Sequence, residues 1–594
     1  MKREWSNRTY IFKNLGTIAR EIWKASPIYF LTVVFNNIIT NILPVVSLII
    51  MQSIINAIQT GEIILKAVLT LVFIYVFIEL FQTILLNLIS HYQTKFTLKF
   101  NLKTKKCILT HAKKLSLKDY ENSETYDSIQ RAQYMNEGHV LSFFSMFAQL
   151  GGTVIKLLSY SALLFELGGW VFCFVLFIPV IQFFAQRALN VEEVKILQER
   201  TEDERRSVYY SQLVANGINF KELEIYNLFD HFISLYTNSV ERFNKQDINL
   251  SKKRHIQSSL FSLVDELLNG VLFAYIIFLG FMKYIMLGNV VVYTRSIIEA
   301  KTSIKNIFTV SAQIQRESLL LDQLFAFLAL SPSEGTVCNE EYLIQIDKID
   351  SIELINISYK YRNTDQYVLK DINLKVVPDK LFVILGENGS GKTTLVKIIM
   401  GFYDDYEGKI LVNGVDLKKI NKKSYMEKIG AVFQDFSKYE ATLRENISFG
   451  NLQVMKNNAF LEKTCEQLKM KDILNLDDLR LDMQLGSWFC NGRQLSIGQW
   501  QKVAIARAFV KDADMYILDE PNAALDVIAE NLLVETYEKF LSGKIGLIIA
   551  HRFHHFIQSA DCIVVLKNGA LVESGTHSDL LANGGVYATM FLLQ

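Results

Sequence analysis

The chain of 594 residues is too long for a single hydrophobic core, so we expect two or more domains. Half of the residues are hydrophobic and 12% are aromatic, a content that indicates membrane-spanning segments in part of the chain. The net charge of +1 provides no field that attracts nucleic acid, and six cysteines without a Cys-x-x-Cys pair argue against a zinc site or a disulfide framework.

The first 26 residues are basic but lack the apolar core and small-residue cleavage site of a signal peptide. Beyond them, six segments approach or exceed the roughly 20 mostly apolar residues that a spanning helix requires. They cover approximately residues 28–57, 63–90, 140–166, 169–188, 257–286 and 290–328. We therefore predict an all-α transmembrane domain of six helices over residues 1–330, embedded in a lipid bilayer.

Lysine and arginine residues gather before the first predicted span and after the second. The short connections on the other side, between spans one and two and between spans three and four, have no comparable basic cluster. The positive-inside rule then places both termini and two long loops, about 91–139 and 189–256, in the cytosol.

Polar side chains recur along the sixth segment at spacings of three and four residues, which is one face of a helix. They are Arg295, Glu299, Thr302, Asn306, Thr309 and Gln313. Such a polar stripe favours a water-filled path, and hydrogen bonding within the bundle is the alternative. Further charges in the spans contact a cationic substrate or form internal ion pairs. These are Glu79, Lys156, Asp265 and Glu266.

A charged stretch, residues 331–350, reads as a linker to a second domain over residues 351–594, where short apolar strands alternate with amphipathic helices. A glycine-rich loop follows the predicted strand Leu381–Leu385 and precedes the predicted helix Leu395–Met400. It reads Gly386-Glu387-Asn388-Gly389-Ser390-Gly391-Lys392-Thr393-Thr394. Its backbone N–H groups and the helix N-terminus cradle phosphates, Lys392 reaches the β- and γ-phosphates, and Thr393 binds Mg²⁺. We therefore predict an α/β P-loop ATPase domain with ATP and Mg²⁺ as ligands.

A second predicted strand, beginning at Met515, ends in two acids, Asp519 and Glu520. A carboxylate at a strand end beside a P-loop holds Mg²⁺ through its water shell, the role that we assign to Asp519. The next acid, Glu520, is placed to act as the general base toward the attacking water.

With these motifs in place, residues 352–594 resemble the nucleotide-binding domain of ABC transporters. The resemblance implies that Leu495-Ser496-Ile497-Gly498-Gln499 is the signature, whose Ser496, Gly498 and Gln499 clamp ATP bound by a partner subunit. It also implies four further roles. Gln434 is the Q-loop glutamine that senses Mg²⁺, Asp526 belongs to the D-loop, His551 is the switch histidine at the γ-phosphate, and Tyr361 stacks on adenine.

Two positions depart from the family pattern. Ile497 replaces the first glycine of the signature, and its branched side chain crowds a place where glycine permits close approach, so we expect a working but slower site. Ala523 stands where the family often has serine, which we expect to loosen coupling between the two ATP sites.

The order of one helical bundle and one ATPase domain resembles an exporter half-transporter of the six-helix, domain-swapped type. This resemblance implies a homodimer with two composite ATP sites. We expect short helices in the cytosolic loops, around residues 121–131 and 220–228, to carry motion between the domains.

Three phrases in the ATPase half resemble nisin-type lantibiotic exporters. They are Gln484–Phe489, Trp500–Gln501 and Phe433–Glu440. The implied cargo is a ribosomally synthesised, modified peptide that crosses the bacterial plasma membrane. Roughly 27 residues precede the first predicted span, so we expect no protease domain that would cut a leader from the cargo.

Two other readings stay open at this point. The bundle could export drugs or flip lipids, as other exporters of this architecture do. Alternatively, the chain could be an ATP-gated channel or a regulatory ABC protein. Such proteins often lose the general base or the switch histidine, and both Glu520 and His551 are present here.

Overall fold

The computed structural model describes residues 2–61, 65–122, 125, 129, 138–330, 343–362, 364–520, 536–537, 540–550 and 555–592. It divides into two compact units, which are considered separately below. The first consists of Met1–Lys114 and Glu124–Leu330, and the second of Leu115–Ser123 and Ser331–Gln594. The short segment Leu115–Ser123 therefore belongs with the second unit, although it lies far from it in the sequence.

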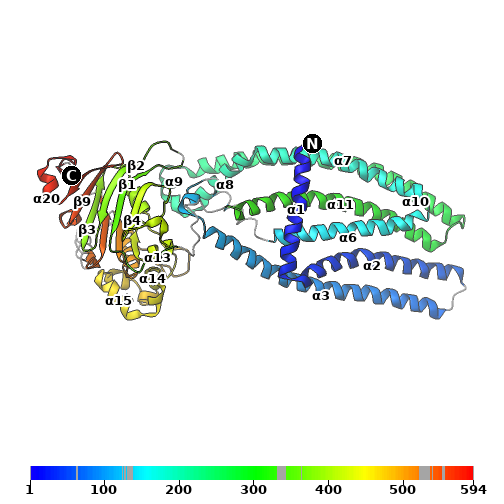
Figure 1. Cartoon of the computed structure of the whole chain (residues 1–594). Helices are drawn as coiled ribbons and strands as arrows, with labels where there is room; N and C mark the ends of the chain where they lie inside the picture. Colours follow the sequence, from blue (N-terminus) through cyan, green and yellow to red (C-terminus); the bar gives the residue numbers. More distant parts are fainter. Residues whose placement is uncertain are drawn as a thin grey trace. The chain divides into compact units, whose positions relative to one another are not determined.

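The described part of the first unit is helical (Figure 1). Its helices are α1 (Lys2–Ala25), α2 (Pro27–Thr60), α3 (Leu65–Ala112), α6 (His139–Phe165), α7 (Gly169–Glu199), α8 (Thr201–Ala215), α9 (Phe220–Ile225), α10 (Phe229–Phe281) and α11 (Leu287–Leu328), with a 3₁₀ turn η1 (Gly217–Asn219) before α9. Figure 1 shows α1 crossing the long helices of the bundle. On α1, Asn14 donates hydrogen bonds to Ser318 at 3.4 Å and Asp322 at 2.6 Å, which fasten it to α11.

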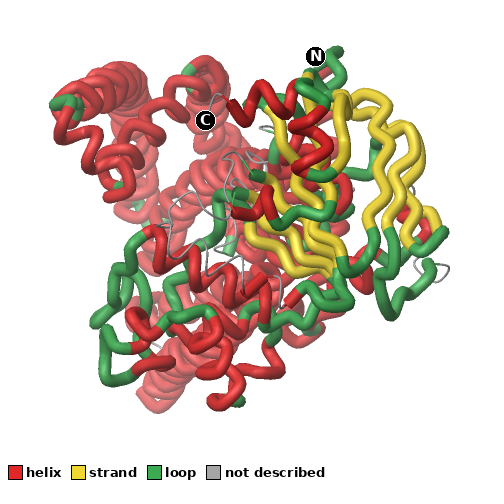
Figure 2. Tube along the Cα trace, turned by 90° about the vertical axis from the view of Figure 1, so that its left-hand side faces the viewer, coloured by secondary structure: helices red, strands yellow, loops and turns green. Residues whose placement is uncertain are grey.

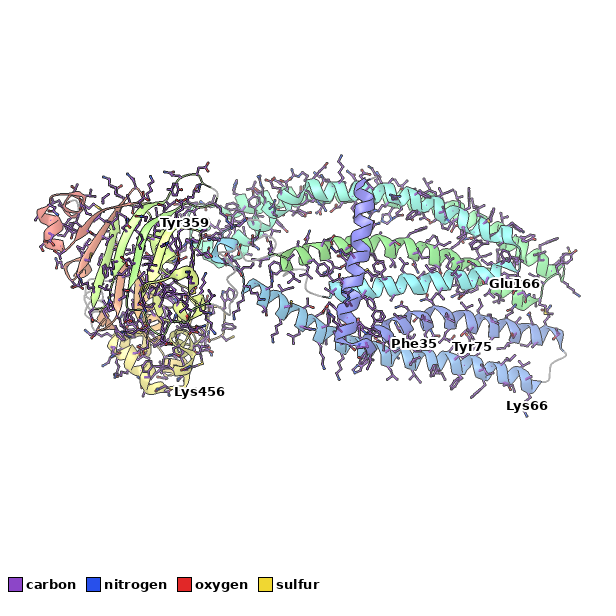
Figure 3. All side chains as sticks on the ribbon, in the orientation of Figure 1. Phe35, Lys66, Tyr75, Glu166, Tyr359 and Lys456 are labelled. Atoms are coloured by element: carbon purple, nitrogen blue, oxygen red, sulfur yellow. The ribbon has the colours of Figure 1, made fainter. Side chains whose placement is uncertain are left out.

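Five of the described helices, α2, α3, α6, α7 and α10, are long and apolar enough to cross a membrane. The protein is therefore a multi-pass membrane protein. Many of their apolar side chains are exposed, such as Phe73 and Phe77 on α3, as expected where lipid replaces water around a helix. Charges occur near the helix ends, where Figure 3 shows Lys66 at the start of α3 and Glu166 just past the end of α6.

The sixth predicted span differs from this expectation. It forms one continuous helix, α11, but α11 is not among the five, because charged and polar residues interrupt its apolar sequence. Several of its apolar side chains, including Val292, Ile297 and Ile304, are buried. They face the helices against which α11 packs, namely α1, α2, α6, α7 and α10.

The second unit contains two sheets, shown in yellow in Figure 2. A four-stranded antiparallel sheet has the order β2 (Leu369–Val376), β1 (Ile352–Tyr359), β4 (Glu407–Val412) and β5 (Val415–Asp416). A six-stranded sheet has the order β10 (Ala570–Gly575), β9 (Cys562–Lys567), β3 (Lys380–Gly386), β8 (Ile545–Ile549), β7 (Met515–Asp519) and β6 (Ile429–Val432). All neighbouring strands of the larger sheet are parallel except β9 and β10.

Helices accompany these strands along the chain, as the βα alternation in the sequence predicts. They are α4 (Leu117–Tyr120), α12 (Lys392–Ile399), α13 (Lys422–Glu427), α14 (Leu443–Ser448), α15 (Asn458–Gln467), α16 (Lys471–Leu474), α17 (Ile497–Phe509), α19 (His555–Gln558), α20 (His577–Ala582) and α21 (Val586–Leu592), with 3₁₀ turns η3 (Leu417–Lys419), η4 (Leu452–Lys456) and η5 (Arg480–Asp482).

Strand β3 is buried on both faces and lies between two hydrophobic clusters. Leu381, Val383 and Leu385 belong to one cluster. Phe382 and Ile384 belong to the other. Successive side chains of a strand point to opposite faces, so a continuous apolar run is what a central strand between two cores requires. This double burial fixes the strand from which the glycine-rich loop emerges.

Candidate nucleotide-binding site

The glycine-rich loop connects β3 directly to α12, as predicted. Gly386 has φ +154° and Gly391 has φ +101°, both in the range that favours glycine. A Cβ atom on Gly386 would lie 2.3 Å from the carbonyl oxygen of Leu566, and one on Gly391 would lie 2.7 Å from the Leu369 side chain. These two positions therefore require glycine both for backbone conformation and for space.

Lys392 begins α12 and turns its side chain back over the loop. Its Nζ donates hydrogen bonds to the carbonyl oxygens of Gly386 at 2.8 Å and Glu387 at 3.0 Å, and the residue is only 5% exposed. Burial lowers the pKa of Lys392, while the nearby carboxylates of Glu520 and Asp519 oppose this shift. The ammonium is thus held beside the loop backbone, where a phosphate chain is expected.

Three predicted site residues follow the carboxyl ends of neighbouring parallel strands, an edge at which ligands of α/β sheets bind. Asp519 ends β7, Glu520 comes next, and Gln434 comes two residues after β6. The side-chain amide of Gln434 donates a hydrogen bond of 2.9 Å to Glu520 Oε2. The P-loop follows β3 at the same edge of the sheet.

The Asp519 carboxylate is buried and is 4% exposed. Its Oδ1 has no hydrogen-bond partner among the described residues, and neither does the Ser390 hydroxyl in the P-loop. Burial, together with the charges of Glu520 and Asp435, raises the pKa of Asp519 to about 6. A buried carboxylate oxygen without a partner fits a Mg²⁺ ion or its water shell, because hard cations prefer oxygen ligands.

Tyr361, the predicted adenine-stacking residue, is half-buried at the end of a short polar chain. Its hydroxyl lies 3.0 Å from Thr394 Oγ1 in the P-loop, and its ring meets Tyr403 edge-on at 5.9 Å between centroids. The Tyr403 hydroxyl donates to both carboxylate oxygens of Glu121, at 2.9 and 3.1 Å. Glu121 belongs to the segment Leu115–Ser123, so a residue of the first predicted cytosolic loop lies two aromatic rings away from the P-loop.

Ion pairs also hold the segment Leu115–Ser123 within the second unit. Lys118 on α4 pairs with Asp404 at 2.6 Å and with Asp405 at 2.7 Å, and its side chain is 8% exposed. Sequence analysis missed Tyr403, Asp404 and Asp405, since no local pattern links them to residues almost 300 positions earlier. Of the two predicted loop helices, Phe220–Ile225 forms α9, whereas most of residues 121–131 lies outside the described residues.

The signature residues lie at the N-terminus of α17. Ser496 caps the helix, accepting a hydrogen bond from the Gln499 backbone N–H, while Gln499 Oε1 accepts from the Ser496 N–H, which is a capping box. Ile497 occupies the first helical position and is 61% exposed, so no core residue constrains it. Within the described residues, no hydrogen bond or ion pair joins Ser496, Gly498 or Gln499 to the P-loop of the same chain.

Three predicted positions lie outside the described residues. They are Ala523, Asp526 and His551. His551 comes shortly after β8, which lies between β3 and β7 in the sheet. Their predicted roles stay predictions.

In the first unit, two of the four charges predicted inside the spans, Lys156 and Asp265, form internal ion pairs, one of the two alternatives left open by the sequence. Lys301 donates to Asp265 and to Asn269, both at 2.6 Å, and the Lys301 and Asp265 side chains are less than 10% exposed. Glu299 accepts from Lys156 at 2.7 Å and from Arg295 at 2.8 Å. The polar stripe on α11 is therefore partly engaged, although Arg295 and Thr302 remain exposed.

Known proteins share this combination of membrane helices and P-loop sheet. The family model described as ABC transporter matches residues 369–523. The chain is 33% identical over 581 residues to the subtilin transport ATP-binding protein SpaT of Bacillus subtilis, an alignment that covers 98% of this chain and 94% of SpaT. The chain belongs to the ABC transporter family. This transporter is also 32% identical over 494 residues to the nisin transport ATP-binding protein NisT of Lactococcus lactis subsp. lactis, covering 80% of this chain and 79% of NisT.

A solved structure with the same fold is that of a bacterial Atm1-family ABC exporter with ATP bound. It superposes with a TM-score of 0.76 at 20% identity and covers 97% of this chain and 99% of that chain. The ABC transporter described here accordingly combines an exporter-type membrane domain with an ATPase domain. It binds and hydrolyses ATP and couples this hydrolysis to transport across a membrane.

Proposed function

We propose that this ABC transporter exports a ribosomally synthesised, modified peptide of the lantibiotic type across the bacterial plasma membrane. The observation that carries the proposal is the extent of the relationship to SpaT, which is named for subtilin transport. Because the alignment covers 98% of the chain, it includes the membrane helices past which a cargo must move, and not only the ATPase half. The relationship to NisT supports the same cargo class.

In this proposal the transporter works as a homodimer, with both termini and the ATPase units in the cytosol. In this arrangement, the signature of one subunit contacts the ATP that is bound by the P-loop of its partner. The lack of any hydrogen bond or ion pair between the signature and the P-loop of the same chain, within the described residues, supports it. The exposed part of the α11 stripe then borders a water-filled path, because an exposed Arg295 is costly against lipid.

The site residues have distinct roles in the proposed hydrolysis cycle. Lys392 binds the β- and γ-phosphates, Tyr361 stacks on adenine, and Ser496, Gly498 and Gln499 complete the partner's site. The residues that would hold Mg²⁺ are Thr393, Gln434 and Asp519, and the ion when bound supplies positive charge to the phosphates. Glu520, oriented by the amide of Gln434 at 2.9 Å, accepts the proton of the attacking water. His551 contacts the γ-phosphate, and Asp526 connects the two ATP sites.

The test of peptide export compares secreted and retained peptides in the producing bacterium by untargeted mass spectrometry. Cells carrying Glu520→Gln should lose one peptide from the medium and accumulate it in the cytosol. Glu427→Gln is a matched control, because Glu427 is an exposed acid of the same unit whose ion-pair contact with Lys423 is 4.0 Å long. Unchanged peptides together with an altered lipid distribution or drug sensitivity would replace this proposal by lipid or drug export.

A further inference from the structure

The first unit contains a cavity of about 500 Å³ between α2, α3 and the beginning of α6. These helices lie side by side in the bundle, where α2 packs against both of the others (Figure 1). Most of the described residues lining the cavity are uncharged and polar, and no lysine, arginine, aspartate or glutamate is among these described residues. The lining lies at the cytosolic ends of the predicted spans, because most of its α3 residues, from Gln93 to Leu98, fall within the predicted cytosolic loop, residues 91–139.

Three hydroxyl groups of this lining donate to carbonyl oxygens of their own helices. Thr94 donates to the Ser90 carbonyl at 3.0 Å, Ser142 to His139 at 3.0 Å, and Ser145 to Ser142 at 2.8 Å. These side chains make the wall polar without offering a hydroxyl proton to a ligand. The remaining hydrogen-bonding capacity of the lining lies mainly in its amide side chains.

Three of these amides come from three different helices: Asn36 from α2, Gln93 from α3 and Gln149 from α6. The Gln93 Nε2 atom is buried and has no hydrogen-bond partner within the described part of the chain. Leaving a buried donor without a partner is unfavourable, so such a group is usually matched by a ligand or water. The cavity thus has a polar lining and a buried hydrogen-bond donor without a partner in the described residues. Both features indicate an occupant that accepts hydrogen bonds.

We propose that this cavity binds a short stretch of the cargo's peptide backbone through amide-to-amide hydrogen bonds. The inference rests on the proposed export of a peptide and adds how that peptide is held. A side-chain amide presents a donor and an acceptor, which match the C=O and N–H groups of a peptide. Apolar lining residues, Tyr29, Val33, Leu98 and Leu141, provide surface for cargo side chains.

The chemistry of the lining also separates a peptide from a phospholipid. A phosphate headgroup is bound best by arginine or lysine, through charge-assisted hydrogen bonds. Neither residue occurs among the described residues that line the cavity. Backbone recognition by neutral amides is indifferent to the cargo's side-chain charges, so one site accommodates successive segments of a moving peptide.

Binding to the full-length transporter in lipid nanodiscs tests this assignment. The probe is a fluorescein-labelled twelve-residue peptide of alternating alanine and serine, compared with the same peptide methylated on its six central backbone nitrogens. Methylation removes the N–H donors and leaves the side chains unchanged. The Kd of the methylated peptide should be at least tenfold higher.

The double substitution Asn36→Leu with Gln93→Met should raise the Kd of the unmethylated peptide by about tenfold, the effect of losing one or two hydrogen bonds. Asn87→Leu is the matched control, because Asn87 is an exposed amide on α3 outside the cavity lining, and it should change the Kd less than twofold. Unchanged thermal unfolding midpoints would establish that each variant is folded.

The outcomes separate this inference from the proposed function. Equal binding of the two peptides, or an equal effect of the control, would overturn backbone recognition in the cavity while the secretion experiment still decides peptide export. Failure of both peptides to bind, with binding of fluorescent phosphatidylglycerol that Gln93→Met abolishes, would overturn both. The assignment would be supported if the double variant lost affinity for the unmethylated peptide while the control variant kept it.

Discussion

The nucleotide site of the ATPase unit and the buried charges of the membrane unit differ in how their polar groups are satisfied. In the ATPase unit, Asp519 Oδ1 and the Ser390 hydroxyl lack partners among the described residues. In the membrane unit, the most deeply buried charges, Lys301 and Asp265, bind each other at 2.6 Å. An unpaired buried group is expensive unless a ligand completes it, whereas a buried ion pair is self-sufficient. The difference distinguishes positions that await a ligand from positions that hold helices together.

The cavity of the membrane unit follows the pattern of the ATPase site. Gln93 Nε2 is buried without a partner in the described residues, as Asp519 Oδ1 is. The charges at Glu299 and Asp265 therefore have a structural explanation, and the neutral cavity becomes the better candidate for cargo contact. Substitutions in both units test the roles assigned to these residues.

The largest effect is expected at the general base. Glu520→Gln should retain ATP binding, because the P-loop is unchanged, but should hydrolyse ATP roughly 10²–10⁴-fold more slowly. Phosphate release by the purified transporter in nanodiscs measures the rate. Near-normal hydrolysis would remove Glu520 from its proposed role, and Glu427→Gln should behave as wild type.

Unlike Glu520→Gln, the variant Lys392→Ala should no longer bind ATP. The buried Nζ is the cation that the P-loop presents to the phosphates, and alanine leaves no charge there. Fluorescence titration with a labelled ATP analogue should show little binding. Lys423→Ala, at an 88% exposed side chain, is the control, and tight binding by Lys392→Ala would contradict the phosphate role.

In the membrane unit, Lys301→Met should destabilise the fold by about 3 kcal/mol, because among the described residues it leaves the buried Asp265 with Lys305, at 3.9 Å, as its remaining cation. Arg295→Gln should have little effect, because Glu299 keeps Lys156 at 2.7 Å. Thermal unfolding in nanodiscs measures both. The double variant Asp265→Leu with Lys301→Met should recover most of the loss, and equal effects of the two single variants would refute the structural role of the buried pair.

A smaller change is expected from Tyr403→Phe. The substitution keeps the ring beside Tyr361 but removes the hydroxyl that binds Glu121, so Tyr361 should be held less firmly. The KM for ATP should rise about threefold to tenfold, which corresponds to the loss of about one hydrogen bond, with kcat little changed. Tyr406→Phe is a close control, since the buried Tyr406 hydroxyl has no partner among the described residues. An identical KM in both variants would exclude a positioning role for Tyr403.

The smallest effect concerns the signature. Ile497 is exposed at the start of α17, and the capping box of Ser496 and Gln499 does not involve its side chain. Ile497→Gly should therefore leave folding almost unchanged and raise the ATPase rate a few-fold, if the isoleucine crowds the partner's nucleotide. A rate equal to or below that of wild type would show that this departure from the family pattern is harmless.

Local sequence was sufficient for much of the fold. The apolar run before the P-loop forms β3, and the predicted strand that begins at Met515 forms β7, which ends at Asp519 with Glu520 next. These predictions were possible because the apolar pattern of a buried strand or an amphipathic helix involves residues that are close together in the sequence. The sixth span was the exception. The predicted helix is present, but its charged and polar residues exclude it from the five helices that are apolar enough to cross a membrane.

The ABC ATPase motifs, the helical membrane domain and the residue types at the nucleotide site are predictable from the sequence, because each depends on spacing along a few turns or one strand. Which charges are paired depends instead on how distant segments pack. Lys301 and Asp265 lie 36 positions apart, and Glu121 and Tyr403 lie 282 apart. This packing also brought Asn36, Gln93 and Gln149 to one cavity. Such contacts depend on how separate helices pack, which no local pattern encodes.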